Sequence, residues 1–137
     1  MDKDNSRAET PVEVVAALIW SDGRFLACRR PPDKARPLLW EFAGGKVEPN
    51  ETREQAVVRE CREELDIIIR PESVFREVVH DYPDITIRLT LFNAVIVSGE
   101  PRAIEHCELR WLTPEEARDY PFCPADKGFI NELSADG

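Results

Sequence analysis

Three acidic side chains, Glu60, Glu63 and Glu64, fall within five residues of a segment whose pattern predicts an amphipathic helix. Positions three and four apart share one helix face, so these carboxylates can converge on one point. Like charges at this spacing repel each other by about a few tenths of a kcal/mol per pair, which a bound cation would compensate. Carboxylate oxygens suit Mg²⁺ or Mn²⁺, whose remaining waters can bridge to phosphates. The alternative interpretation is a solvated polar face.

Neighbouring residues favour the metal site over the solvated face. Arg59 lies beside Glu63 on the helical wheel and can neutralise part of the repulsion. Glu51 stands just outside the helix start. Gly44 and Gly45 are expected to form a tight backbone turn just before the helix.

These residues resemble the Nudix box, the signature of the Nudix hydrolases, at the spaced positions Gly45, Glu51, Arg59, Glu60, Glu63 and Glu64. Two residues depart from that pattern. Cys61 stands where a larger aliphatic residue is usual, a mild change because a buried thiol behaves as a small hydrophobe. Asp66 replaces the glycine expected in a left-handed conformation after the helix, at a cost of about 1 kcal/mol.

The resemblance implies both an activity and roles for residues. Nudix hydrolases cleave a nucleoside diphosphate linked to another group, X, by Mg²⁺-assisted attack of water on phosphorus, and Mn²⁺ is expected to substitute. By similarity the cations would be held by Gly44, Glu60, Glu63 and Glu64. Glu51 and Arg59 would orient these ligands through an ion pair rather than touch substrate.

Outside the box, "LLWEFAGGKVEP" and "PFCPADKGFI" are similar to segments of the MutT-like branch, which includes oxidised-nucleotide and CTP pyrophosphohydrolases. Glu105 matches by spacing a loop glutamate that supplies a further metal ligand or base in that branch; a solvated loop side chain is the alternative. Asp126 matches the residue whose side chain hydrogen-bonds the edge of the base. Its alternative is a helix N-cap.

Further residues are candidate substrate contacts. Phe42 could stack on the base, although a buried phenylalanine is more often part of a core. Lys46 is a candidate phosphate contact or a plain surface lysine. Arg29 and Arg30, at the end of a strand that faces the substrate side in the family, are candidate phosphate contacts.

The histidines and cysteines predict no site of their own. His80 and His106 are interpreted as ordinary polar residues, because the chemistry above needs no histidine. The cysteines have no CxxC spacing and no cluster of histidines near them, so we expect small core residues rather than a zinc site or a disulfide framework: Cys28, Cys61, Cys107 and Cys123.

The elements that must position these residues are predicted from periodicity and turn signals. "VEVVAALIW" is almost continuously apolar, as in a strand buried on both faces, and "RFLACRR" follows as its hairpin partner. "IIIRPESVFREVVHDY", "ITIRLTLFNAVIV" and "CELRWL" are predicted strands. Capping boxes at Thr52 and Thr113 open two helices, and a last helix is expected over about 125–133. The fold class is therefore α+β, a mixed sheet sandwiched between helices (α/β/α) as in the Nudix fold.

Length and charge limit the remaining possibilities. With 137 residues, the chain suits one domain, taken as 11–137, after a disordered polar tail at 1–10. A net charge of −9 disfavours duplex nucleic acid. No apolar run approaches the roughly 20 residues of a membrane span, so we expect a cytoplasmic protein. The expected assembly is a monomer or a homodimer.

The leading hypothesis is a Mg²⁺-dependent nucleoside triphosphate pyrophosphohydrolase that releases a nucleoside monophosphate and pyrophosphate. Expected substrates are oxidised purine triphosphates such as 8-oxo-dGTP, or CTP-like pyrimidine triphosphates. One alternative is a Nudix hydrolase of ADP-ribose or nucleotide sugars. Another is a non-catalytic nucleotide-sensing Nudix domain, which the intact Glu60, Glu63, Glu64 and Arg59 disfavour.

Overall fold

The computed structural model describes residues 10–136. The tail predicted at 1–10 therefore lies, apart from Thr10, outside the described residues. In chain order the elements are β1 (Val12–Ser21), β2 (Arg24–Arg29), β3 (Trp40–Glu41), β4 (Ala43–Lys46), α2 (Arg53–Leu65), β5 (Ile68–Asp81), β6 (Thr86–Ser98), β7 (Glu108–Leu112), α3 (Pro114–Ala117) and α4 (Pro124–Asp136).

The strands form a seven-stranded mixed sheet with the order β3-β2-β1-β6-β5, in which β4 also pairs with β1 and β7 with β2. The β1–β6 pair is parallel and the other pairs are antiparallel. The predicted β1–β2 hairpin is confirmed, but its ladder is short, pairing Trp20 with Phe25 and Ser21 with Arg24. Further back along β1 the neighbour is β4 instead.

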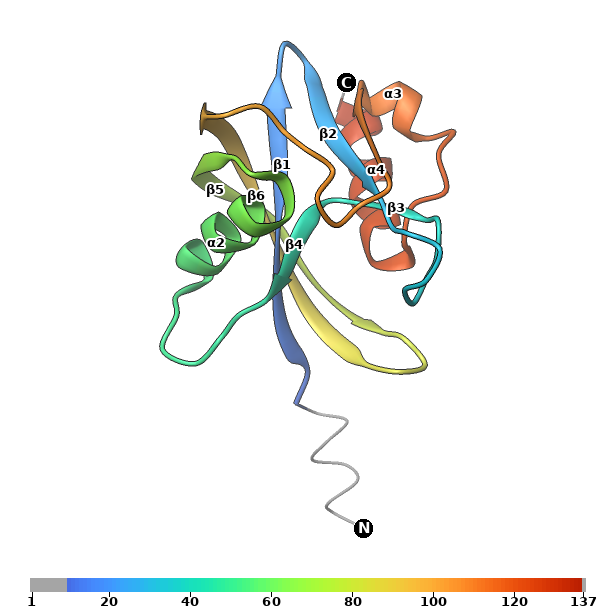
Figure 1. Cartoon of the computed structure of the whole chain (residues 1–137). Coiled ribbons are helices and arrows are strands. Elements are labelled where there is room, and N and C mark those ends of the chain that lie inside the picture. The colour runs from blue at the N-terminus through green and yellow to red at the C-terminus, as the bar shows by residue number, and fades with distance from the viewer. Residues whose placement is uncertain (1–9, 137) are drawn as a thin grey trace.

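Helices cover both faces of this sheet, which confirms the predicted α/β/α arrangement (Figure 1). Strand β1 is central because its residues are buried alternately on the two sides. Val15 and Ala17 pack in the core that includes α2, whereas Ala16 and Leu18 pack in the core that includes α4. This alternation follows from the two-residue period of a strand and explains the continuous apolar run in the sequence.

Helix α2 begins and ends as the sequence predicts. Thr52 is the N-cap, and its hydroxyl and the Gln55 side chain form the reciprocal bonds of a capping box. Asp66 ends the helix in the left-handed conformation, with φ 58° and ψ 41°. The core-facing side of α2 consists of Ala56, Val57, Cys61 and Leu65, which are fully buried, and Val58 is partly buried against the same core.

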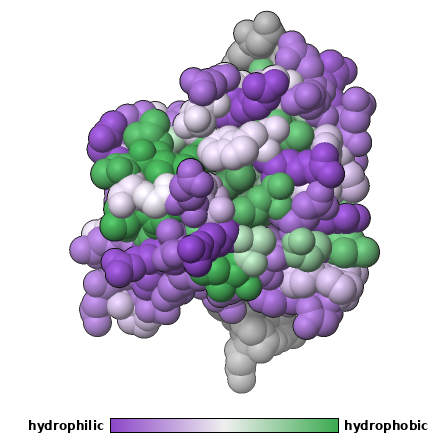
Figure 2. All heavy atoms as spheres, turned by 45° about the horizontal axis from the view of Figure 1, so that its top comes forward, coloured by the Kyte–Doolittle hydropathy of each residue, from purple (hydrophilic) through white to green (hydrophobic). Residues whose placement is uncertain are grey.

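At the other end of the chain, the Thr113 capping box is also confirmed. The last helix, α4, spans Pro124–Asp136, slightly longer than predicted. In the described part of the chain, no helix has both the length and the apolar character needed to cross a membrane. Figure 2, which brings the β1–β2 turn forward, shows apolar side chains lying among polar ones on that face.

Candidate active site

The side chains of Glu60, Glu63 and Glu64 lie on one face of α2, but their environments differ. The side chains of Glu60 and Glu64 are 14% and 10% exposed, whereas that of Glu63 is 54% exposed. Burial, together with hydrogen bonding and repulsion from Glu60, raises the pKa of the Glu64 carboxyl to about 10. The carboxylates of Glu60 and Glu64 are therefore recessed and lie close together.

Arg59 joins these glutamates to the segment before the helix. Its Nε and Nη2 donate to the two carboxylate oxygens of Glu51 at 2.7 and 3.0 Å, a bidentate pair. Nη1 donates to Glu60 Oε2 at 3.0 Å and to Glu63 Oε1 at 3.2 Å. Hydrogen bonding to Arg59 lowers the pKa of Glu51, and the same bond raises that of Arg59. The ion pair expected from the sequence is present.

The two glycines before the helix lie in a strand rather than in the predicted tight turn. Gly44 and Gly45 belong to β4, where they pair with Ala16 and Val15 of β1. A Cβ on Gly44 would collide with the Val15 carbonyl oxygen, and a Cβ on Gly45 would collide with the Glu60 carboxylate. Close approach, rather than backbone conformation, therefore requires glycine at position 44, where backbone blocks a side chain, and at position 45 a side chain would displace the flexible end of Glu60.

The donor chemistry of this face fits a divalent cation. Glu64 Oε1 is buried with no hydrogen-bond partner within residues 10–136. An ionised carboxylate in such a position calls for a cation to compensate it, and the donors present are hard oxygens. As the side chains stand, no three His, Cys, Asp or Glu residues of the described chain converge closely enough to hold a metal ion. Glu63 is turned toward Arg59 instead.

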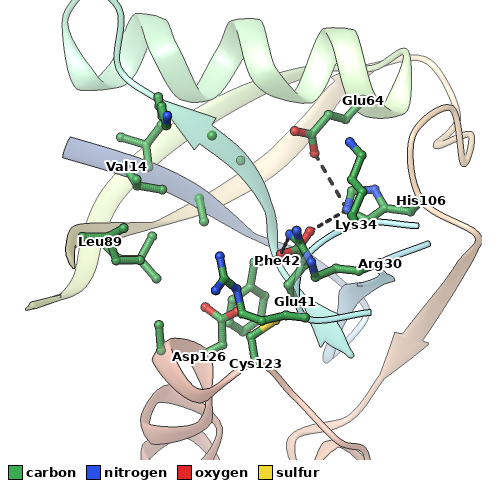
Figure 3. Close-up of a pocket in the computed structure, with 18 of the residues that line it drawn as sticks. Val14, Arg30, Lys34, Glu41, Phe42, Glu64, Leu89, His106, Cys123 and Asp126 are labelled. Carbon is green, nitrogen blue, oxygen red and sulfur yellow. Dashed lines mark hydrogen bonds and ion pairs between the residues drawn. The ribbon is translucent and has the colours of Figure 1, made fainter. Parts of the chain in front are cut away.

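Beside Glu64 lies a pocket of about 310 Å³. It is lined by residues of β1, β4 and β6 and by the start of α4. In Figure 3, Glu64 reaches toward it from α2, while Asp126 and Cys123 approach from the opposite end. Apolar side chains of β1 and β6, including Val14 and Leu89, form one wall. The pocket thus combines an apolar surface with ionisable groups at both ends, as expected of a small-molecule site.

Asp126 is buried in this pocket and is not the N-cap that the sequence left open. It is the third residue of α4, which begins at Pro124. Burial raises its pKa well above the ordinary value; the negative charge of Glu41 also raises it, and Arg30 opposes both effects. A protonated carboxyl group can both donate and accept hydrogen bonds, so Asp126 is equipped to bind a base edge.

Of the predicted substrate contacts, Phe42 and Lys46 line the pocket, and so does Glu105, the predicted further metal ligand or base. Phe42 is buried and packs on Phe25 and Phe122, with ring centroids 5.6 and 5.8 Å apart. It is therefore a core residue with one edge on the pocket. The Glu105 carboxylate lies 3.8 Å from the Lys34 ammonium group.

Of Arg29 and Arg30, only Arg30 lines the pocket, and Arg29 pairs with Glu108 outside it. Among the described residues, those lining the pocket include Arg30 but not Arg29. Arg29 instead pairs with Glu108 at 3.3 Å and lies over the Trp40 ring. Successive residues of an extended chain point to opposite sides, so only one of the two can face the pocket. Of the two candidates, Arg30 is therefore the one placed to contact substrate in this pocket.

Two polar residues of the pocket, Glu41 and His106, were missed by sequence reasoning. His106, interpreted from the sequence as an ordinary polar residue, is buried, and its Nε2 lies 2.9 Å from Glu41 Oε2. Arg30 donates to the other oxygen of Glu41 at 2.9 Å. A glutamate between Trp40 and Phe42 was the available signal, since a charged residue inside an apolar strand needs a partner.

Comparison with known proteins agrees with this geometry. A family model described as the NUDIX domain matches residues 14–132, and the chain belongs to this family, as its sequence motif indicated. The chain is 44% identical over 124 residues to the CTP pyrophosphohydrolase of Escherichia coli K12, covering 90% of this chain and 92% of the relative. It is 35% identical over 105 residues to the 8-oxo-dGTP diphosphatase of the same strain, covering 77% and 81%.

The fold is also similar to solved structures. The crystal structure of the MutT NUDIX hydrolase from Burkholderia pseudomallei superposes with a TM-score of 0.80 at 30% identity. The match covers 90% of this chain and 98% of that one. The protein is thus a Nudix hydrolase of the MutT-like type, with the α+β fold that its sequence predicted.

Proposed function

We propose that this protein hydrolyses a nucleoside triphosphate at the β-phosphorus, releasing a nucleoside monophosphate and pyrophosphate with the help of Mg²⁺. The observation that carries the proposal is the position of Glu64, which lines the 310 Å³ pocket and interacts with the neighbouring recessed carboxylate of Glu60. A nucleotide whose base lies near Asp126 would extend its phosphates toward α2. The relatives named CTP pyrophosphohydrolase and 8-oxo-dGTP diphosphatase support the same substrate class.

In this proposal each group has a separate task. Glu60, Glu63 and Glu64 hold the divalent cation, with the Gly44 carbonyl and Glu105 as further oxygen ligands. When bound, such a cation neutralises phosphate charge and lowers the pKa of a coordinated water toward neutrality. Mn²⁺, with similar ligand preferences, would substitute for Mg²⁺.

The other residues bind and orient. Arg59, held by Glu51, fixes Glu60 and Glu63 through the hydrogen bonds described above. Arg30, Lys46 and the edge of Phe42 offer cationic and aromatic contacts to the nucleotide from the pocket wall. The Asp126 carboxyl group, at the far end, binds the base edge.

The proposed enzyme is one domain, residues 11–137. It acts in the cytoplasm as a monomer or homodimer and does not bind duplex nucleic acid. Both cores share a single sheet, which supports one domain. The net charge of −9 supports a small polyanionic substrate bound through a cation rather than a nucleic-acid duplex.

A substrate panel tests the proposal. CTP, dCTP, 8-oxo-dGTP, dGTP, ADP-ribose and a nucleotide sugar would each be incubated with the protein and Mg²⁺ or Mn²⁺. We expect a nucleoside monophosphate and pyrophosphate from at least one triphosphate, with kcat/KM above that for ADP-ribose. Faster cleavage of ADP-ribose or the sugar nucleotide, or tight binding without hydrolysis, would contradict the proposal.

A further inference from the structure

The buried His106 imidazole lies between two carboxylates of the pocket (Figure 3). Its Nε2 is 2.9 Å from Glu41 Oε2 and 3.9 Å from Glu64 Oε1. The side chain of His106 is only 4% exposed, compared with 20% for Glu41 and 10% for Glu64. His106 therefore contacts Glu41 of the pocket wall and faces Glu64 of the candidate metal site.

The backbone around His106 is fixed to the two elements that carry these carboxylates. The N–H of Ile104 donates to the Glu64 carbonyl at 3.2 Å, which ties the loop to the C-terminal end of α2. On the other side, the N–H of Cys107 donates to the Arg29 carbonyl at 2.9 Å, at the end of β2. The backbone is thus fixed on both sides of His106.

Two buried polar atoms among Glu41, Glu64 and His106 lack a hydrogen-bond partner within residues 10–136. Glu64 Oε1 and His106 Nδ1 are both buried without a hydrogen-bond partner in the part of the chain described. The Glu41 carboxylate can only accept, so His106 donates to it from Nε2. In this tautomer Nδ1 carries no proton and is an unpaired acceptor. The donor at Nε2 then faces two acceptors, and a shift of about 1 Å would bring Glu64 Oε1 within hydrogen-bond distance.

We propose that His106 is a positioning residue for Glu64, acting through the Nε2–H that it shares between Glu41 and Glu64. Held at Oε1 by this donor, the Glu64 carboxylate would present its other oxygen to a divalent cation. Such outer partners orient metal ligands, and their loss typically costs about 10- to 100-fold in metal affinity or activity. Glu41, fixed at its other oxygen by Arg30, keeps the imidazole in position. The inference rests on the proposed function, because it takes Glu64 as a ligand.

Metal binding itself provides the first test, since it needs neither substrate nor turnover. Free Mn²⁺ would be measured by electron paramagnetic resonance during titration of the wild-type protein and three variants. His106→Leu and His106→Phe remove the donor, and the phenyl ring also fills the space of the imidazole; His106→Gln keeps an N–H donor. We expect the Kd for Mn²⁺ to rise about 10- to 100-fold in the variants without a donor and to stay near the wild-type value in His106→Gln.

Kinetics with CTP and Mg²⁺ provide the second test. The same two variants should require more Mg²⁺ for half-maximal activity and show a lower kcat, with His106→Gln restoring both. Ile104→Ala is the matched control in the same loop, because this exposed side chain is dispensable for the Ile104 N–H bond to α2. Thermal unfolding of each variant shows whether a loss reflects the fold instead.

The outcomes separate this inference from the proposed function. Wild-type Mn²⁺ affinity in His106→Leu and His106→Phe would overturn the role of His106, as would an affinity in His106→Gln as weak as in those two. A wild-type protein that hydrolyses no triphosphate would overturn the proposed function, while the Mn²⁺ titration would still decide the role of His106.

Discussion

At the scale of single residues, the site depends on carboxyl groups placed where they are difficult to ionise. Glu64 and Asp126 are both buried, and burial is the largest cause of the raised pKa of each. They lie at opposite ends of one pocket. The same physical effect therefore serves two tasks in the proposed reaction: Glu64 becomes a strong ligand once a cation is present, and Asp126 keeps a proton for hydrogen bonding to a base.

Replacing Glu64 with Gln should lower kcat about 100-fold or more, because a neutral amide is a poor ligand for a hard cation. Glu63→Gln is expected to act in the same direction. The measurement is the steady-state release of pyrophosphate with Mg²⁺. Glu54→Gln, exposed on the same helix, is the control and should retain wild-type turnover. Near-normal turnover in both site variants would refute the assignment of these ligands.

Asp126→Asn should stabilise the protein at neutral pH. The folded-state pKa of Asp126 is raised. Above its unfolded-state pKa of roughly 3.9, the unfolded chain loses a proton that the folded chain keeps, so stability falls as pH rises through this range. We expect the free energy of unfolding in urea to favour the variant by on the order of 1 kcal/mol at pH 7.5. The gain should vanish near pH 4, and a gain independent of pH would contradict the explanation. Asp119→Asn, at an exposed turn, is the control.

At the scale of elements, β4 and α2 are arranged so that strand backbone touches helix side chains. The two glycines of β4 permit this contact in different ways. Gly44 faces backbone of β1, which cannot give way, while Gly45 faces the flexible end of Glu60. The end of α2 shows a second local constraint, since Asp66 adopts a left-handed conformation with φ 58°.

Gly45→Ala is expected to reduce activity more than stability, because the new methyl group displaces the Glu60 carboxylate. Gly44→Ala should mainly destabilise the fold, because its methyl group meets the Val15 carbonyl in the β1–β4 ladder. Thermal unfolding and kcat measured on both variants would distinguish them. A Gly45→Ala protein with full activity would show that Glu60 needs no fixed position.

Asp66→Gly should stabilise the protein by about 0.5–1 kcal/mol, because glycine adopts the left-handed conformation without steric cost. Asp66→Ala, which keeps a Cβ but lacks the polar side chain, should be less stable than the wild type. The free energy of unfolding in urea is the measurement. Equal stability of the glycine and alanine variants would contradict this account of the helix end.

At the scale of the whole molecule, a net charge of −9 is combined with carboxylates recessed beside one pocket. Repulsion among these groups opposes folding when no cation is present. A divalent ion bound only by the folded state therefore stabilises the fold by mass action.

Mg²⁺ should accordingly raise the Tm of the wild-type protein, with a saturating dependence on concentration. The increase should be largely lost in Glu64→Gln. Differential scanning fluorimetry with MgCl₂, compared with KCl at the same ionic strength, separates binding from screening. An equal increase of Tm in KCl would show that no specific site is involved.

Much of this architecture was predictable because it is local. The capping boxes at Thr52 and Thr113 and the left-handed Asp66 follow from residues within a few positions of each other. The strand assignments follow from the alternation of apolar residues. Strand pairing was less accessible: the sequence before α2 predicted a turn at Gly44, whereas its ladder with β1 depends on residues far away in the chain.

By itself, the sequence determined which side chains share the face of α2, since a helix places positions three and four apart together whatever surrounds it. Tertiary structure alone decided that Arg30 rather than Arg29 faces the pocket, and that Glu41 meets His106 although 65 positions separate them. The physical reason is that helix geometry is fixed by bonds between near neighbours. The approach of strands and loops is fixed instead by packing and hydrogen bonds among residues distant in the chain.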